Sequence, residues 1–212
     1  LLCVPSDARN AAHGANSTDN TSSSDVSSCN YPARQFGIRN GMPLGKARLL
    51  CPDLTVLPYD FDLYNQTARK FYQILAKNAD ILMAVSCDEA YLQVAVEEED
   101  LMGFVSDLRA EISAVCKCNA SVGISTTVLL ARLATKKAKP NNQFYIPIDE
   151  CQQYIKDVPI DDLPGVGWSL SERIAAKFKA ETCDQLQKIT LSELQREFGP
   201  TTGKTLYERC RG

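Results

Sequence analysis

The sequence predicts an α+β fold, in which helices pack on one face of an antiparallel sheet and an all-helical segment follows. Residues 29–146 alternate between helical and strand patterns in the order α-β-β-α-β-α-β, which suits such a layer. Residues 147–212 carry no strand pattern and are typical of a cluster of short helices. With 212 residues, 44% of them hydrophobic, the chain is long enough to bury a substantial core.

The expected elements can be placed in order along the chain. Residues 5–28 are rich in Ser, Asn, Asp and Thr with almost nothing to bury, which predicts a flexible polar loop or insertion. The later patterns predict a helix over 61–75, a hairpin over 81–96, a helix over 101–115, a strand over 120–124, a basic helix ending before Pro140, and a strand over 143–146. After these, one helix is expected to end near Val158 and another to begin near Ser169.

Composition and charge exclude some classes of protein. The net charge of −3 gives no general sign of nucleic-acid binding, although affinity for DNA depends on local charge. No apolar run approaches the roughly 20 residues that span a bilayer, so no membrane partner is expected. The nine cysteines are scattered without a C-x-x-C pair, which predicts reduced thiols in an intracellular protein. The single histidine, His13, lies in a polar stretch and is not expected to act in catalysis.

Two adjacent carboxylates, Asp88 and Glu89, lie in the link of the expected hairpin. Two carboxylates held close together repel each other, which raises the pKa of each. A divalent metal ion bound between them would offset this repulsion. Carboxylates that hold Mg²⁺ are typical of phosphoryl and nucleotidyl transfer. A solvated turn, or a capping box formed by Ser86 and Glu89, explains the same residues equally well from this motif alone.

A local cationic patch lies on the expected basic helix. Arg132, Lys136 and Lys139 follow i, i+4 and i+7 spacing on one face, with four basic residues and no acid between 132 and 139. Pro140 is expected to stop the helix. A solvated helix face is the ordinary alternative, and the lack of a compensating acid disfavours it somewhat. One of three hydroxyl residues is expected to cap the helix start, namely Ser125, Thr126 or Thr127.

The C-terminal segment contains a glycine hairpin, Leu-Pro-Gly-Val-Gly at 163–167, between two expected helices. Gly165 and Gly167 allow the backbone N–H groups to approach a phosphate, and the helix that follows adds its positive end. Ser169 and Glu172 suggest a capping box for that helix. This is the helix-hairpin-helix device for holding a DNA backbone without reading its bases.

A second, weaker match to this motif covers residues 198–204 and includes Gly203 and Lys204. It follows a Thr190–Glu193 capping box. A single glycine turn is usually only a turn, whereas two glycine hairpins in one helical segment favour phosphate binding.

Together these motifs resemble the Y-family of translesion DNA polymerases, and within it the deoxycytidyl transferase branch of eukaryotes. Residues 28–42 are similar to the family's fingers segment, 86–90 to its palm metal motif, 121–140 to its second palm motif, and the double hairpin to its thumb. Residues 50–61 and 206–212, with the cysteine at 87, favour the branch. The resemblance implies partial fingers over 1–60, a palm without its first strand over 61–146, and a helical thumb over 147–212.

The resemblance also implies roles for individual residues. Asp88 and Glu89 become the catalytic carboxylates that bind Mg²⁺, with Asp88 bridging two ions and Glu89 holding the ion that activates the primer 3′-hydroxyl. The residues implied to contact the incoming deoxynucleoside triphosphate are Tyr31, Arg34 and Lys139, with Ser28 and Asn40 as weaker candidates. The residues implied to contact primer-template DNA are Gly165, Gly167, Ser169, Gly203, Lys204, Arg132 and Lys136.

Some positions depart from the family pattern. Thr127 stands where Asn is usual, Pro32 where Glu is usual, and Asn142 where Gly is usual, although Asn tolerates left-handed backbone. The family's first catalytic aspartate, on a strand before Leu1, and its little finger, after Gly212, are expected to lie outside this sequence. We therefore expect residues 1–212 alone to bind DNA weakly and to be inactive in primer extension.

The function predicted from these observations is translesion synthesis in DNA repair, carried out in the nucleus. The resemblance implies contacts with other translesion polymerase subunits through segments absent here. Two alternatives stay open at this point: a non-catalytic DNA-binding or scaffolding module, and a nucleotide cyclase with a palm-like sheet. The Tyr31 and Arg34 pair and the helical thumb disfavour the cyclase, which needs no grip on a primer backbone.

Overall fold

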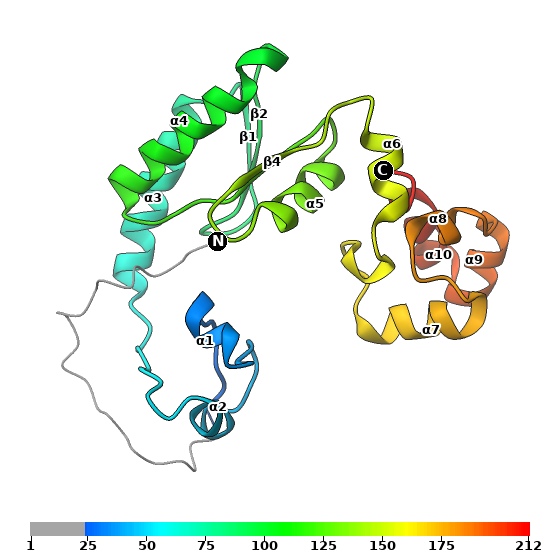
Figure 1. Cartoon of the computed structure of the whole chain (residues 1–212), viewed down its shortest axis with the longest axis horizontal. Helices are drawn as coiled ribbons and strands as arrows, with labels where there is room; N and C mark the ends of the chain where they lie inside the picture. The colour runs from blue at the N-terminus through cyan, green and yellow to red at the C-terminus, as the bar shows by residue number, and fades with distance from the viewer. Residues whose placement is uncertain (1–23) are drawn as a thin grey trace. The chain divides into compact units, whose positions relative to one another are not determined.

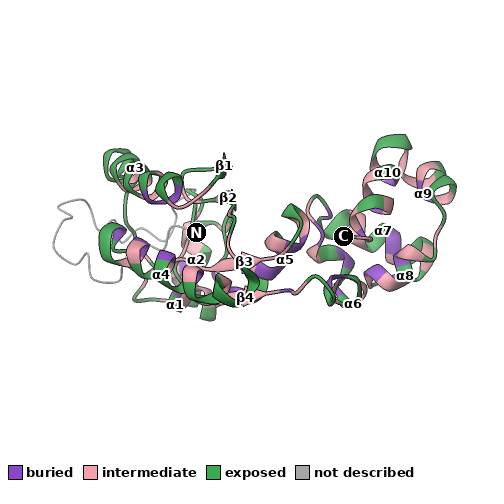
Figure 2. Cartoon of the chain, turned by 90° about the horizontal axis from the view of Figure 1, so that it is seen from above, coloured by how far each residue is buried: buried purple, intermediate pink, exposed green. Residues whose placement is uncertain are grey.

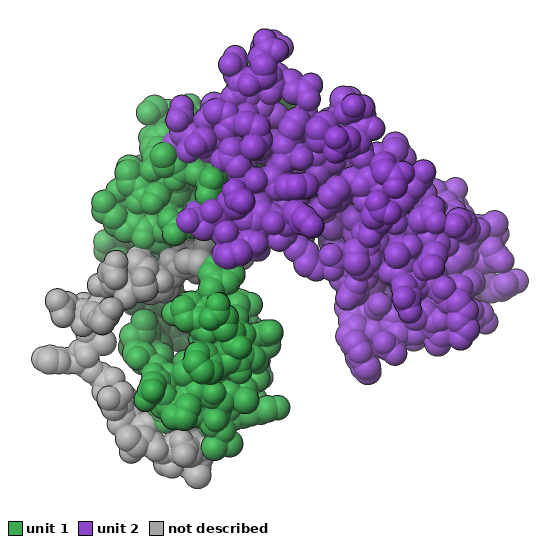
Figure 3. Space-filling model, in the orientation of Figure 1, with its two compact units in different colours: residues 1–95, 108–120 green, residues 96–107, 121–212 purple. Residues whose placement is uncertain are grey.

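The computed structural model describes residues 24–212, which cluster into two compact units (Figure 3). The first unit holds the described residues up to 95 together with 108–120, and the second holds 96–107 together with 121–212. Most of the predicted flexible segment over 5–28 lies outside the described residues. Its last residues, 24–28, lie in no helix or named strand, and two contacts tie them to residues 42–43: the Val26 N–H donates to the Met42 carbonyl (2.8 Å), and Asp25 forms an isolated β-bridge with Pro43.

Two short helices, α1 (Tyr31–Gln35) and α2 (Leu44–Leu50), form a small structure around one apolar cluster (Figure 1). Its buried centre consists of Ala33, Ile38 and Ala47. The Asn30 side chain caps α1 by accepting from the Ala33 N–H (3.0 Å). Pro32 lies in the first turn, where a helix needs no N–H from it, so this departure leaves the helix start intact.

The predicted helix and hairpin are confirmed next along the chain. Helix α3 (Phe61–Lys77) begins at Asp60, whose carboxylate accepts from the Leu63 N–H (2.9 Å). Strands β1 (Ile81–Ala84) and β2 (Ala90–Gln93) pair antiparallel, with Ala84 opposite Ala90. The acidic link and its Asp88–Glu89 pair therefore lie at the closed end of a hairpin.

Helix α4 (Glu98–Cys116) is longer than predicted, because its acidic start is helical. Glu98, Glu99 and Asp100 form its first turn, ahead of the predicted start at 101. Negative side chains stabilise the positive N-terminal end of a helix. Glu98 also accepts a hydrogen bond from the Tyr145 hydroxyl (2.8 Å).

The second pair of strands corrects the predicted all-antiparallel sheet. Strands β3 (Val122–Ile124) and β4 (Gln143–Tyr145) pair parallel, because α5 (Val128–Ala138) provides the long crossover that parallel strands require. The four strands of residues 24–212 form two separate pairs, and the α+β class is confirmed. In the turn that follows α5, the left-handed residue is Asn141, at φ 50°, and not Asn142 as expected.

Residues 147–212 form a helical cluster, as predicted. Its elements are α6 (Cys151–Asp157), the short 3₁₀ helix η1 (Ile160–Asp162), α7 (Trp168–Phe178), α8 (Cys183–Gln187), α9 (Leu191–Phe198) and α10 (Pro200–Arg209). One buried apolar core runs from α5 through these helices, and Figure 2 shows buried positions on α5 and α6. Within residues 24–212, none of the helices combines the length and apolar character needed to cross a bilayer.

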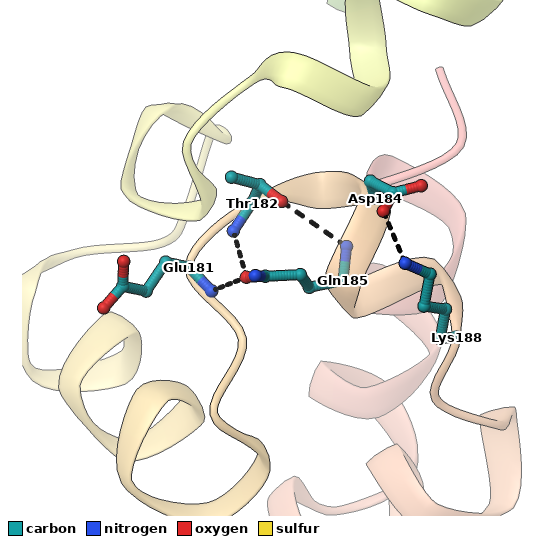
Figure 4. A network of polar contacts seen from close by, with 5 residues as sticks. All are labelled: Glu181, Thr182, Asp184, Gln185 and Lys188. Atoms are coloured by element: carbon teal, nitrogen blue, oxygen red, sulfur yellow. Dashed lines mark hydrogen bonds and ion pairs between the residues drawn. The ribbon is translucent and has the colours of Figure 1, made fainter.

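Local polar contacts fix the helix starts in this cluster. Thr182 and Gln185 form a reciprocal capping box at α8, and Lys188 pairs with Asp184 one turn away (Figure 4). The predicted Thr190–Glu193 capping box begins α9. Each box satisfies backbone N–H groups that have no partner within the helix.

Candidate functional site

The link between β1 and β2 is held in one conformation by hydrogen bonds to its own backbone. The Glu89 carbonyl accepts from the N–H groups of Val85 (3.0 Å) and Ser86 (3.1 Å). The Ser86 hydroxyl donates to the Asp88 carboxylate (2.6 Å) and accepts from the Asp88 N–H (3.3 Å). No helix begins here, so the capping-box alternative is wrong. Serine instead orients the aspartate carboxylate within a turn between two strands.

The pair of carboxylates suits a hard divalent cation in its donor chemistry. Asp88 is half-buried and Glu89 is exposed, so oxygen ligands are presented at the end of the hairpin. Among residues 24–212, no three His, Cys, Asp or Glu side chains gather closely enough to hold a metal ion by themselves. Any metal site at this link would therefore need ligands beyond these two carboxylates.

The implied nucleotide-binding residues of the first unit gather on one segment around α1. Tyr31 is the first residue of α1 and Arg34 lies in its last turn, with Ser28 and Asn40 exposed on either side. The Arg34 Nε donates to the Cys29 carbonyl (3.1 Å), which fixes the direction of the side chain. Arg39, which the sequence did not single out, donates to the Arg34 carbonyl (2.9 Å) and so braces the end of the same helix.

The basic helix is α5, and its cap is Thr127, whose hydroxyl accepts from the Leu130 N–H (3.2 Å). Arg132 is exposed, as expected for a cationic face. Lys136 differs from the prediction, because Asp162 of η1 forms an ion pair with it. The acid missing from the sequence around Lys136 comes from a segment 26 residues away. Lys139 caps the C-terminal end of the helix through its N–H, which donates to the Thr135 carbonyl (3.2 Å).

The first glycine hairpin has the backbone geometry that its sequence predicts. Gly165 is exposed at φ +77°, a left-handed conformation that favours glycine. Leu163 and Val166 are buried and anchor the loop on either side of it. Gly167 is the N-cap of α7, and it has no side chain that could accept from the backbone N–H groups of the first turn. Gly167 is also exposed, so the start of α7 lies at the surface.

Ser169 does not form the predicted capping box with Glu172. The helix begins one residue earlier than expected, at Trp168, so Ser169 lies inside the first turn. Trp168 itself is 79% exposed directly beside the hairpin. Trp168 was not among the residues predicted to contact DNA, although its position directly after Gly167 could have suggested such a contact.

A second residue that sequence reasoning missed contacts the backbone of this hairpin. Arg209 of α10 donates through Nη1 to the Pro164 carbonyl. The same Nη1 would lie 2.8 Å from a Cβ at Gly165, so the guanidinium occupies the space that a side chain there would need. Arg209 is 45 residues away in sequence, and no local pattern links the two positions.

The second glycine motif corrects one predicted contact. Gly199, at φ +85°, ends α9 and precedes α10, so it forms a true hairpin. Gly203 is buried inside α10, and its N–H donates to the Gly199 carbonyl (2.9 Å). Its N–H is therefore not available to a phosphate. Lys204 is exposed and pairs with Glu208 at 3.7 Å.

Comparison with known families identifies two matching segments. Residues 11–136 match the model of the impB/mucB/samB family, and residues 161–212 match the model described as DNA polymerase-iota, thumb domain. The first match alone covers more than half of the chain.

Similar proteins come from eukaryotes and bacteria. DNA repair protein REV1 of Arabidopsis thaliana is 42% identical over 192 residues, which cover 89% of this chain and 17% of that protein. DNA repair protein rev1 of Schizosaccharomyces pombe is 39% identical over 193 residues, covering 89% of this chain and 21% of that protein. DNA polymerase IV of Photorhabdus laumondii is 36% identical over 191 residues, covering 88% of this chain and 54% of that protein.

Solved structures of similar fold include the insertion ternary complex of Dbh DNA polymerase, with a TM-score of 0.82 and 27% identity over 88% of this chain and 55% of that one. DinB from Sulfolobus solfataricus matches with the same TM-score of 0.82 and 27% identity. The chain thus spans about a fifth of the length of the REV1 relatives and about half of the DNA polymerase IV, Dbh and DinB proteins. None of these comparisons supports the cyclase alternative.

Proposed function

Because this chain belongs to the Y-family of translesion DNA polymerases, we propose that it supplies most of the catalytic core of an enzyme that adds deoxynucleotides to a primer 3′ end during damage bypass. In this proposal the segment around α1 serves as fingers, the strands with α3 to α5 as palm, and residues 147–212 as thumb. The observation that carries the proposal is the ordered Asp88–Glu89 link, because it places two carboxylates at the end of a rigid hairpin.

Asp88 and Glu89 would hold Mg²⁺, and Mg²⁺ bound there would stabilise the negative charge that develops during nucleotidyl transfer. The Ser86 hydroxyl, 2.6 Å from the Asp88 carboxylate, keeps one carboxylate oxygen pointed back into the turn. The other carboxylate oxygens then serve as ligands. Two-metal sites need more oxygens than this pair supplies, so we propose that a further carboxylate elsewhere in the whole protein completes the site.

The remaining residues act by binding and orientation. Arg34 and Lys139 would neutralise the triphosphate of the incoming nucleotide, Arg34 as a forked donor and Lys139 as a point charge. Tyr31, Ser28 and Asn40 would contact the same ligand from the α1 segment.

The hairpin at Gly165 and Gly167 would hold the backbone of the primer strand through its N–H groups. Arg132 on α5 and Lys204 on α10 would add positive charge for DNA phosphates, which makes binding weaker at high salt. Lys136 would join them only by giving up its ion pair with Asp162. This grip depends on backbone and charge, so it should not depend on base sequence.

The relatives named REV1 support the finer parts of the proposal. Those of Arabidopsis thaliana and Schizosaccharomyces pombe are named DNA repair proteins, which supports a nuclear protein of the deoxycytidyl transferase branch, and we propose that it recognises damaged DNA. We propose that its contacts with other translesion polymerase subunits lie in the rest of the intact protein.

Primer extension tests this function directly. Residues 1–212 and the intact protein are each given primer-template DNA, Mg²⁺ and one deoxynucleotide at a time, opposite undamaged and abasic templates. We expect the intact protein to insert dCTP preferentially, and residues 1–212 alone to bind DNA weakly without extending the primer. DNA binding by the intact protein without any extension would favour the alternative of a non-catalytic scaffolding module.

A further inference from the structure

One tyrosine outside the predicted site contacts the acidic link from the neighbouring helix. The Tyr72 hydroxyl, on α3, lies 2.5 Å from the Ser86 carbonyl oxygen and 2.9 Å from the Glu89 carbonyl oxygen. These two carbonyls flank Cys87 and Asp88 on either side. A phenol has one proton to donate, so the two carbonyls share a single donor.

Tyr72 has the support needed to hold this position. It is half-buried on α3, and its ring packs edge-on against Phe71 at a centroid distance of 5.4 Å. Ile74 and Leu75, on the following turn, are buried and fix the helix. The Tyr72 side chain therefore extends to the link from a helix that buried residues hold in place.

Several donors meet at one backbone carbonyl of the link. The Glu89 carbonyl accepts from Val85, from Ser86 and from Tyr72, so three donors converge on this one oxygen. Two of them belong to the link and only Tyr72 comes from outside it. Two adjacent carboxylates repel each other, which favours opening of the turn when no cation is bound. An outside donor opposes this opening.

We propose that Tyr72 is a positioning residue for the metal-binding carboxylates: its hydroxyl fixes the backbone that carries Asp88 and Glu89, and so sets the affinity of the site for divalent cations. The inference rests on the proposed function. It assigns Tyr72 no contact with substrate or metal. Metal sites typically depend on such outer contacts for the orientation of their ligands.

The test compares Tyr72→Phe with Tyr64→Phe in the intact protein. Both substitutions remove one hydroxyl from α3, but Tyr64 lies two turns earlier, with its ring against Phe61. Binding of Mn²⁺, measured by electron paramagnetic resonance, should be about three- to tenfold weaker in Tyr72→Phe, the loss expected for one hydrogen bond, and unchanged in Tyr64→Phe. The Mg²⁺ concentration for half-maximal primer extension should rise by a similar factor, while affinity for DNA stays the same.

Amide hydrogen exchange separates this inference from the proposed function. Residues 86–89 should exchange faster in Tyr72→Phe whether or not a metal binds, and 4-aminophenylalanine at position 72, which keeps an N–H donor, should restore both exchange and Mn²⁺ affinity. Unchanged exchange in Tyr72→Phe overturns the positioning role. Mn²⁺ affinity that is unchanged in Asp88→Ala would instead overturn the assignment of the metal site itself.

Discussion

Replacement of Gly203 by alanine should destabilise the protein, because this glycine allows α9 and α10 to approach closely. A Cβ at position 203 would lie 2.5 Å from the Gln195 nitrogen and 2.6 Å from the Leu194 carbonyl carbon, both backbone atoms that cannot turn aside. Overpacking of this kind costs roughly 1–3 kcal/mol, and alanine recovers about 1 kcal/mol through its higher helix propensity. Because the contact is with backbone, we take the upper end of the first range and expect a net loss of about 2 kcal/mol.

Gly103 on α4 provides the matched control, since a Cβ there would meet nothing within 4 Å. Gly103→Ala should therefore raise the free energy of unfolding by roughly 0.5–1 kcal/mol. Urea unfolding followed by far-ultraviolet circular dichroism measures both variants against wild type. If Gly203→Ala matches or exceeds wild-type stability, α9 and α10 do not pack as closely as described. A contact between Gly203 and DNA would then again be a possible reason for the glycine.

Three further predictions concern ligands and thiols. Arg34→Ala and Lys139→Ala should each weaken nucleotide binding to the intact protein by about 1.5–3 kcal/mol, measured by calorimetry. Gly165→Val should weaken DNA binding equally on all base sequences in fluorescence anisotropy, because its Cβ would meet Arg209 and its φ of +77° is strained. Burial raises the pKa of the Cys183 thiol to about 12, so this thiol should stay protonated and resist iodoacetamide near pH 8, whereas exposed Cys87 should react.

Each of these predictions can fail separately. Unchanged nucleotide affinity in both charge variants would remove their phosphate role. A Gly165→Val effect that varies with base sequence would indicate direct readout of bases. Alkylation of Cys183 as fast as that of Cys87 in the folded protein would contradict the burial of Cys183 at the start of α8.

Local sequence signals were enough to predict the elements that depend on neighbouring residues. The period-two pattern around the acidic link predicted the hairpin, and the Thr190–Glu193 spacing predicted the start of α9. The Leu-Pro-Gly-Val-Gly motif predicted the glycine hairpin between two helices, in which Gly165 lies at φ +77°. In each case the determining contacts lie within a few residues of one another.

Contacts between distant segments could not be predicted in the same way. Nothing near Tyr72 indicates that its hydroxyl meets a link 14 to 17 residues away, and nothing near Arg209 indicates the Pro164 carbonyl. The parallel pairing of β3 with β4 was missed because the order of elements was taken to indicate an antiparallel sheet, although the helix predicted between these two strands is a crossover of the length that a parallel pair requires. Gly203 was assigned to DNA contact because a helix-packing glycine and a loop glycine look alike in sequence.

Primer extension by single variants of the intact protein shows whether Asp88 and Glu89 are catalytic carboxylates, as we claim. Glu97→Ala serves as the control, because Glu97 is an exposed acid outside the link. Asp88→Ala and Glu89→Ala should each abolish Mg²⁺-dependent extension while DNA affinity stays near wild type, and Glu97→Ala should extend normally. Wild-type extension rates in either Asp88→Ala or Glu89→Ala would contradict the claim.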